Sequence, residues 1–174
     1  MAEIAKKELP YTAFFPGDIM VVERGKETLG DIESTRRLGK GDIDEYLTFG
    51  SSFNVTKTAK RWISERLDKN FIFGAFTGGK LAAVASLVAW LPEMTVIMGV
   101  ETKQKYRGRG LGSAVVSGAV GEAMRRSEAC SLTVSSDDTP AIELYRKLGF
   151  RKVGDDEARQ VPHGVLHLPP VVEG

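Results

Sequence analysis

Cysteine and histidine are both scarce in this sequence, which has one cysteine and two histidines in 174 residues. The single cysteine, Cys130, excludes an intrachain disulfide. No histidine stands near it in the sequence, so Cys130 lacks the partner that activates a thiol as a covalent nucleophile. His163 and His167 belong to a proline-rich tail, where we expect structural or exposed positions. We therefore expect neither a disulfide framework nor a metal site.

The sequence also lacks a charge excess and a long hydrophobic run. Lysine and arginine number 24 against 23 aspartate and glutamate residues, which gives a net charge of +1. This balance provides no general attraction to nucleic acid or a membrane, so any anion site has to be local. The longest near-continuous apolar stretch, 81–92, is too short to span a bilayer, and the first ten residues lack the apolar core of a signal peptide. We expect a cytoplasmic protein without nucleic-acid or membrane partners.

What the sequence does contain is the composition of one globular domain. Hydrophobic residues make up 42% of the chain and charged residues 27%, which suits a domain with its own core. We predict a flexible N-terminus over 1–10 and a single domain over 11–174.

Hydrophobic periodicity and turn residues predict a series of strands and helices. The expected strands lie within 11–23 and at about 33–38, 71–76, 81–90, 95–102, 131–136, 150–153 and 165–168. The expected helices begin near 41, 55, 111 and 138, and the third of them runs to about residue 127. The strand at 95–102 is apolar at almost every position, which predicts burial on both faces.

The order of these elements predicts the fold class. The passage from 95 to 136 is a strand, a helix and a strand, which implies a parallel pair joined by a crossover helix. Gly78-Gly79 between two apolar runs predicts an antiparallel hairpin. We therefore predict an α/β (α+β) fold: one mixed, mostly antiparallel central sheet of about six to seven strands with a parallel central pair, flanked by about four helices.

A glycine-rich basic loop, Arg107-Gly108-Arg109-Gly110-Leu111-Gly112, joins the apolar strand to the next helix. The first N–H groups of a helix lack intrahelical partners, and glycines let a diphosphate approach them closely. Arg107 and Arg109, with Lys103 and Lys105 nearby, add charge-assisted contacts. The loop lacks the Walker Gly-Lys-Ser/Thr, and Ser113 stands where a dinucleotide loop needs glycine. A pyrophosphate site suited to coenzyme A is our main interpretation. A flexible turn with a solvated basic face and a nucleic-acid contact are the alternatives.

Two segments resemble the GNAT superfamily of acetyl-CoA-dependent N-acetyltransferases. GVETKQKYRGRGLGSAVVSGAV is similar to the family's strand, Arg/Gln-x-x-Gly-x-Gly/Ala loop and helix. DDTPAIELYRKLGFRKVG is similar to its Asn-x-x-Ala-x-x-x-Tyr-x-x-x-Gly-Phe segment, with Asp138 in place of the asparagine. The resemblance covers about Phe71 to Val153. It implies an acyltransferase with acetyl-CoA as co-substrate and no metal, in which about 11–70 forms the acceptor side, about 71–153 the CoA-binding core and about 150–174 a C-terminal hairpin.

The resemblance also implies roles for individual residues. Tyr145 matches the tyrosine that protonates the departing CoA thiolate. Its apolar helical stripe also suits a core position, but the Gly149-Phe150 that follows favours the catalytic role. Because Asp138 stands where the family has asparagine, the resemblance does not settle whether residue 138 contacts CoA. The CoA-binding residues implied by the match are Val100, Glu101 and Thr102 on the strand, Arg107, Gly108, Arg109, Gly110, Leu111, Gly112 and Ser113 in the loop, and Asp138.

The general base and the acceptor are less specified. Family members place a base where this chain has Val96, Met98 or Thr133, so Glu101 and Glu93 are the candidate bases, beside a water relay or an amine that arrives neutral. The acceptor is a small-molecule amine or a protein or peptide amine. Four acidic residues of 40–70 suit either a cationic amine or a solvated helix face; they are Asp42, Asp44, Glu45 and Glu65.

Three broader alternatives remain from the sequence. The protein is a CoA-binding regulator without turnover, a basic-loop nucleic-acid binder, or the acetyltransferase that the resemblance implies. We expect a monomer or a homodimer.

Overall fold

The computed structural model describes residues 17–49, 57–68 and 72–154. The strands are β1 (Asp18–Glu23), β2 (Thr35–Arg37), β3 (Ile72–Thr77), β4 (Lys80–Trp90), β5 (Met94–Thr102), β6 (Ala129–Val134) and β7 (Arg151–Lys152). The helices are α2 (Ile43–Phe49), α3 (Lys57–Asp68), α4 (Leu111–Ala123) and α5 (Thr139–Lys147), with short 3₁₀ turns at Lys40–Asp42 and Gln104–Tyr106. The N-terminus predicted to be flexible over 1–10, the predicted strand at 165–168, the tail histidines and the part of the predicted C-terminal hairpin after residue 154 lie outside the described residues.

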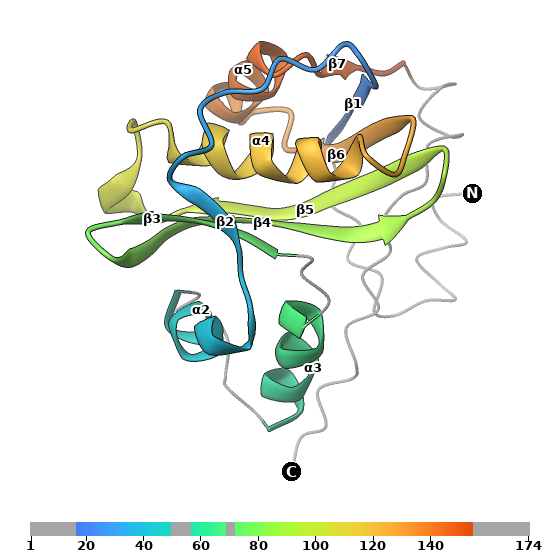
Figure 1. The fold of residues 1–174 in the computed structure, drawn as a ribbon. Coiled ribbons are helices and arrows are strands. Elements are labelled where there is room, and N and C mark those ends of the chain that lie inside the picture. The colour runs from blue at the N-terminus through green and yellow to red at the C-terminus, as the bar shows by residue number, and fades with distance from the viewer. Residues whose placement is uncertain (1–16, 50–56, 69–71, 155–174) are drawn as a thin grey trace, which may run out of the picture.

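The strands form a seven-stranded sheet in the order β2-β3-β4-β5-β6-β1-β7 (Figure 1). β5 and β6 pair in parallel, and the other recorded pairs are antiparallel. α4 joins the two parallel strands, because an antiparallel hairpin turn cannot connect them. The predicted mixed sheet with one parallel pair is confirmed.

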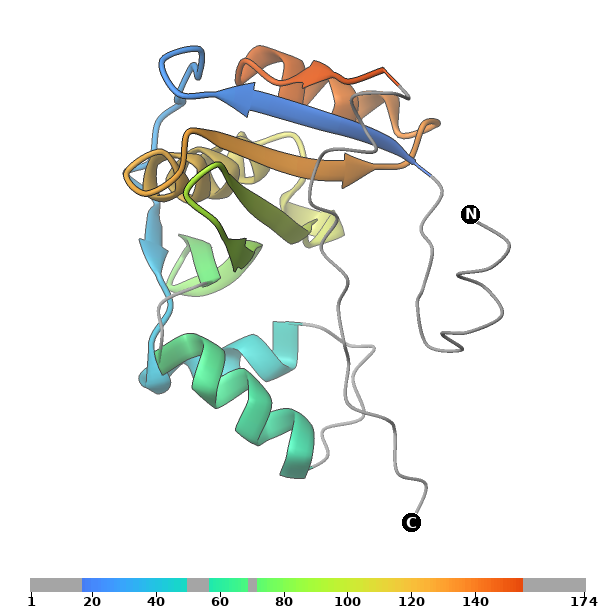
Figure 2. The ribbon, with the colours of Figure 1, turned by 90° about the vertical axis from the view of Figure 1, so that its right-hand side faces the viewer.

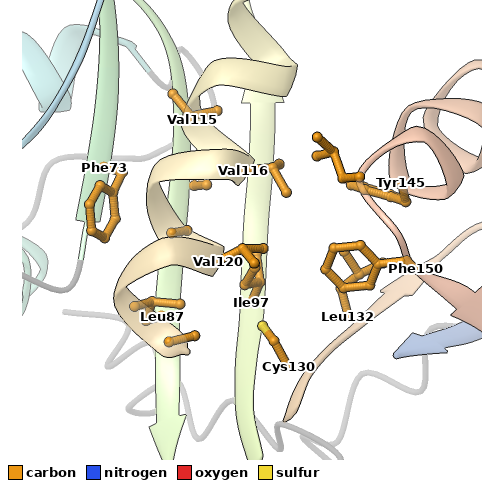
Figure 3. Close-up of a cluster of buried hydrophobic side chains, with 14 of the residues drawn as sticks. Phe73, Leu87, Ile97, Val115, Val116, Val120, Cys130, Leu132, Tyr145 and Phe150 are labelled. Atoms are coloured by element: carbon orange, nitrogen blue, oxygen red, sulfur yellow. The ribbon is translucent and has the colours of Figure 1, made fainter. Parts of the chain in front are cut away.

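Helices cover both faces of the sheet (Figures 1 and 2). α2 and α3 lie on one face, where Phe49, Ile63 and Leu67 pack against Leu81 and Val84 of β4. α4 and α5 lie on the other face, over a separate and larger apolar cluster (Figure 3). Alternate strand residues point to opposite faces, which is why neighbours such as Val84 and Ala85 belong to different clusters.

The β3–β4 hairpin turns at Gly78 and Gly79, whose φ angles are 56° and 73°. Two successive left-handed residues match the twist of a two-residue hairpin, and glycine adopts them without a steric penalty. Thr77 and Lys80 pair on either side of the turn. The predicted hairpin is confirmed at its predicted position.

β5 differs from the predicted strand in its second half. Thr95, Val96 and Ile97 are buried, as expected, but Gly99 and Glu101 are exposed. The prediction of burial on both faces along 95–102 was therefore wrong beyond Ile97. The pairing of β5 with β6 ends in the same region, since it runs only over Met94–Val96.

Two other boundaries differ from the sequence prediction. α4 ends at Ala123 rather than near residue 127, and β6 ends at Val134 rather than at 136. Arg125 and Arg126 therefore lie in turns after the helix, whereas a helix that ran to about residue 127 would contain them. Both arginines form ion pairs with the same carboxylate, that of Glu122 in the last turn of α4.

Glu122 is the centre of a charge cluster between α4 and the sheet edge. Its side chain is only 3% exposed and forms ion pairs with Arg37 of β2, Arg125 and Arg126, the last at 3.1 Å. Arg37 belongs to the edge strand and the other two arginines follow the helix. One buried carboxylate therefore ties β2 to the C-terminal end of α4.

Replacing Glu122 by glutamine should lower the free energy of unfolding by about 2 kcal/mol or more. That is below the ~3–5 kcal/mol lost when a fully buried pair is broken, because the guanidinium groups are partly exposed. Urea denaturation measures the change. Glu65→Gln, which breaks the exposed pair with Arg61, is the matched control and should cost less than about 0.5 kcal/mol. Equal losses in the two variants would contradict a structural role for the Glu122 cluster.

Candidate functional site

The site is built on the divergence of the two parallel strands. β5 and β6 pair at only three positions, Met94–Val96 with Ala129–Ser131, whereas β5 pairs with β4 along nearly its whole length. Backbone N–H and C=O groups require partners when they are shielded from water. Beyond Val96 the β6-facing edge of β5 has no strand partner among the described residues, so another extended chain can pair with it.

A β-bulge marks the same part of β5. Its register against β4 shifts between Val84 and Ser86, and Gly99 has a φ of 62°. Ser86 Oγ, at 4.0 Å, is the nearest atom to the position of a Cβ added at Gly99. Glycine therefore provides the left-handed conformation of the bulge and leaves open space beside the strand.

A cavity of about 600 Å³ fills the opening between the strands. Its walls come from β5, the glycine loop, the first turn of α4, β6 and α5. Most of the predicted site residues line it: Val100, Thr102, Arg107, Gly108, Gly110, Leu111, Gly112, Ser113, Asp138 and Tyr145. Glu101, Arg109 and Glu93 are not among the lining residues.

The glycine loop begins α4 with two left-handed residues. Gly108 and Gly110 have φ angles of 73° and 77°, and Gly110 is the N-cap, with no side chain to occupy the first N–H groups. Gly112 packs closely, since a Cβ there would lie 3.1 Å from Thr102 Oγ1 and 3.5 Å from Leu144 Cδ1. Amide donors at a helix N-terminus with no capping side chain suit an anion.

The basic residues of this segment divide between the two faces of the sheet. Arg107 lines the cavity, and its Nε donates to Thr102 O at 3.3 Å. Lys105 and Arg109 lie over the Tyr106 ring, at 4.8 and 5.7 Å from its centre. Lys103 does not join them, because its ammonium lies 4.8 Å from the ring centre of Phe49 in α2. The sequence grouped Lys103 with the loop, and strand alternation separates it.

Tyr145 lies on α5 at the cavity wall and is only 6% exposed. Its ring packs against that of Phe150, with 5.9 Å between the ring centres, and Figure 3 shows the two side chains in the cluster between α4 and α5. Burial, with a smaller contribution from the Asp138 carboxylate, raises the pKa of Tyr145 to about 12. The phenol thus keeps its proton at neutral pH. Tyr145 belongs to the apolar core and also lines the cavity. Its position therefore suits both a core tyrosine and a general acid.

Asp138 caps the helix that carries Tyr145. Its carboxylate accepts a hydrogen bond from the Ala141 N–H at 3.1 Å, and Pro140 lies in the first turn of the helix. This confirms the predicted helix start. Cys130 is fully buried in the cluster beneath α4, and burial raises the pKa of its thiol. A shielded, protonated thiol is a poor nucleophile.

The two candidate bases lie at opposite ends of β5. Glu93 is exposed in the β4–β5 turn, before the part of β5 that is paired with β6. Glu101 is exposed on the strand two residues after Gly99 and pairs with Val84. At ~3.3 Å per residue, Glu93 is about 20 Å along the strand from Gly99, against about 7 Å for Glu101.

The four acidic residues considered for the acceptor side each have a partner. Asp42 pairs with Arg36, Asp44 with Lys60 and Glu65 with Arg61. Glu45 Oε1 accepts the Leu81 N–H at 2.9 Å. These contacts favour a structural interpretation of all four residues.

The sequence did not indicate the β6 wall of the cavity. Leu132, Thr133, Val134 and Ser135 line it, although only Thr133 attracted attention, as a position where some family members carry a base. An alternating strand gives no sign that one of its edges is unpaired. The helices of residues 17–49, 57–68 and 72–154 lack the length and apolar run that crossing a bilayer requires.

Comparison with known proteins gives a consistent family. The model described as "Acetyltransferase (GNAT) family" matches residues 43–150, more than half of the chain. A curated relative, an uncharacterized N-acetyltransferase of Methanocaldococcus jannaschii, is 26% identical in an alignment of 151 residues, and the match covers 76% of this chain and 64% of the relative. The chain therefore spans less than two thirds of that relative.

Solved structures agree on the fold. A GNAT-family protein from Novosphingobium aromaticivorans aligns with a TM-score of 0.62 and 24% identity, over 79% of this chain and 60% of that one. A GNAT-family acetyltransferase from Colwellia psychrerythraea aligns with a TM-score of 0.64 and 16% identity, over 87% of this chain and 58% of that one. At these identities the structural likeness establishes the arrangement of elements.

The Asp138 cap can be tested with two substitutions. Asp138→Asn should leave the free energy of unfolding nearly unchanged, because asparagine caps helices as well as aspartate does. Asp138→Ala should lower it by about 1 kcal/mol, because the Ala141 N–H loses its acceptor. Thermal or urea denaturation provides the measurement. If both substitutions destabilise the protein equally, the charge rather than the cap is what Asp138 contributes.

Proposed function

The chain belongs to the acetyltransferase (GNAT) family, and on that premise we propose that it transfers the acetyl group of acetyl-CoA to a primary amine. The observation that carries the proposal is the unpaired edge of β5, which leads directly to a glycine loop with free helical amides. A ligand with an amide-containing arm and a pyrophosphate matches these two features in that order.

In the proposed complex the pantetheine arm lies along Val100, Glu101 and Thr102 as an added strand, bonded to the backbone groups of this segment that point away from β4. The amides of 107–113 bind the pyrophosphate, and Arg107 and Arg109 supply charge. Gly112, packed against Thr102, keeps the loop close to the end of β5. We propose the region of about 71–153 as the CoA-binding core and about 11–70 as the acceptor side.

The chemistry that we propose is direct acyl transfer. The amine nitrogen bonds to the thioester carbonyl carbon, and the carbon–sulfur bond breaks. Amides of β5 polarise the carbonyl, and the Tyr145 hydroxyl gives its proton to the departing sulfur. The proton lost by the amine passes to Glu101, directly or through water, and Tyr145 regains its proton from solvent. Glu101 is preferred to Glu93 because it lies nearer the bulge at Gly99.

Two other functions have less support. A CoA-binding regulator without turnover has the same binding site and lacks only the chemistry, so Tyr145 is the residue that separates it from an enzyme. A nucleic-acid binder would use the basic loop as a charged surface. The balanced net charge gives that interpretation little support.

Acetyl-CoA should bind the protein, and Gly110→Ala should raise the dissociation constant by at least about tenfold. Alanine at a φ of 77° is strained by about 1–2 kcal/mol, so the loop amides shift to relieve it. Gly79→Ala is the control, because it has a similar φ of 73° in the distant hairpin. Calorimetric titration measures both. No binding at millimolar acetyl-CoA, or equal losses in both variants, would contradict the site.

Tyr145→Phe should lower the rate of thiol release by about 10²-fold with little change in acetyl-CoA affinity. The pKa of about 12 lies above the ordinary value of 10, so the phenol stays protonated throughout the neutral range. The wild-type rate should therefore show no loss from Tyr145 ionisation until the pH passes 10. Thiol release is followed with a chromogenic disulfide at several pH values. An unchanged rate and profile in Tyr145→Phe would exclude the general-acid role.

A further inference from the structure

The charged residues at the end of β5 lie on the sheet face opposite the glycine loop. Thr102 faces α4, because its Oγ1 lies beside Gly112. Lys103 N donates to Ala82 O, which continues the pairing with β4, and the Lys103 side chain reaches Phe49 of α2. Glu101 is paired with Val84, whose side chain packs in the α2–α3 cluster. Directly paired strand residues share a face, so Glu101 and Lys103 both point towards α2 and α3.

The open part of the sheet connects this face to the cavity. Glu101 and Lys103 follow one another on the α2–α3 side, about 7 Å apart along the strand, and the bulge at Gly99 precedes them. Gly99 lines the cavity and adds no side chain on this side. An amine that approaches from the α2–α3 side would therefore meet the opening at Gly99, with Glu101 and then Lys103 beside it.

Glu101 and Lys103 differ from the other charges on this face. Asp44, Glu65 and their cationic partners pair with each other, and Glu45 accepts a backbone N–H. Within the described residues neither Glu101 nor Lys103 has an ion pair; the Lys103 ammonium rests on the Phe49 ring alone. A carboxylate and an ammonium two residues apart on one strand thus remain available to a ligand.

We propose that the acceptor is a small zwitterionic amine of the amino-acid class, with Lys103 binding its carboxylate and Glu101 its amino group. This inference rests on the proposed acetyl transfer and names its substrate class. A polyamine or a lysine side chain carries only positive charge, so Lys103 would repel it where Glu101 attracts it. An acceptor with both charges satisfies both residues, and Phe49 holds Lys103 in place beneath its carboxylate. Lys103 is accordingly a specificity-determining residue.

The test compares amino acids with the amines that remain after loss of the carboxylate: lysine with cadaverine, phenylalanine with phenethylamine, and alanine with ethylamine. For at least one pair, kcat/KM for the amino acid should exceed that for its partner by about tenfold or more. Lys103→Met keeps the apolar stem on Phe49 and removes the charge. It should raise KM for the amino acid by about tenfold and lower KM for the decarboxylated amine, because the repulsion between Lys103 and a cationic acceptor is lost. Lys80→Met, at the exposed start of β4, is the control and should preserve the discrimination.

Two results would overturn the inference while leaving acetyl transfer intact: decarboxylated amines reacting as well as amino acids, or discrimination that survives Lys103→Met. A second measurement separates failure of the chemistry from failure of recognition. The same amino acids are titrated into protein saturated with CoA, where no reaction is possible. Binding that is weakened about tenfold by Lys103→Met supports the acceptor site even if no amine of the panel releases thiol. Absence of both binding and turnover contradicts it.

Discussion

The separation of β5 from β6 after three paired residues is the constraint on which the rest of the structure depends. Two parallel neighbours would ordinarily satisfy each other's backbone along their whole length. Here α4 and α5 pack over the ends of β5 and β6 that have separated. They supply walls of a cavity at the place where hydrogen bonds between the two strands would otherwise continue. The bulge at Gly99 belongs to the same arrangement, because it re-aims the strand at the point where pairing with β6 has stopped.

Stability and chemistry are distributed over different parts of this frame. Glu122 and its arginines secure the far end of α4 to β2, while the near end of the same helix presents bare amides at Gly110. α5 has a similar division, since Asp138 caps its start and Tyr145 contributes both to the core and to the cavity. Each helix therefore combines residues that stabilise it with an element that lines the cavity.

Local patterns predicted much of this structure. The Gly78-Gly79 turn, the cap at Asp138 and the strand–helix–strand passage each depend on a few adjacent residues, and all three are found where the sequence indicated them. The loop residues were likewise predicted, and most of them line the cavity. What the sequence missed depends on contacts between distant segments. Exposure of the second half of β5, the β6 wall and the separation of Lys103 from Lys105 follow from strand pairing and alternation, which apolar composition does not encode.

The two apolar clusters on opposite faces of the sheet have a consequence for how such a chain can change. The α2–α3 layer packs on its own set of strand side chains, and the α4–α5 layer packs on the alternate set. Substitutions beneath one layer therefore repack that layer without touching the other. Residues on the proposed acceptor side could therefore change during evolution while the proposed CoA-binding side stays the same and the protein remains folded.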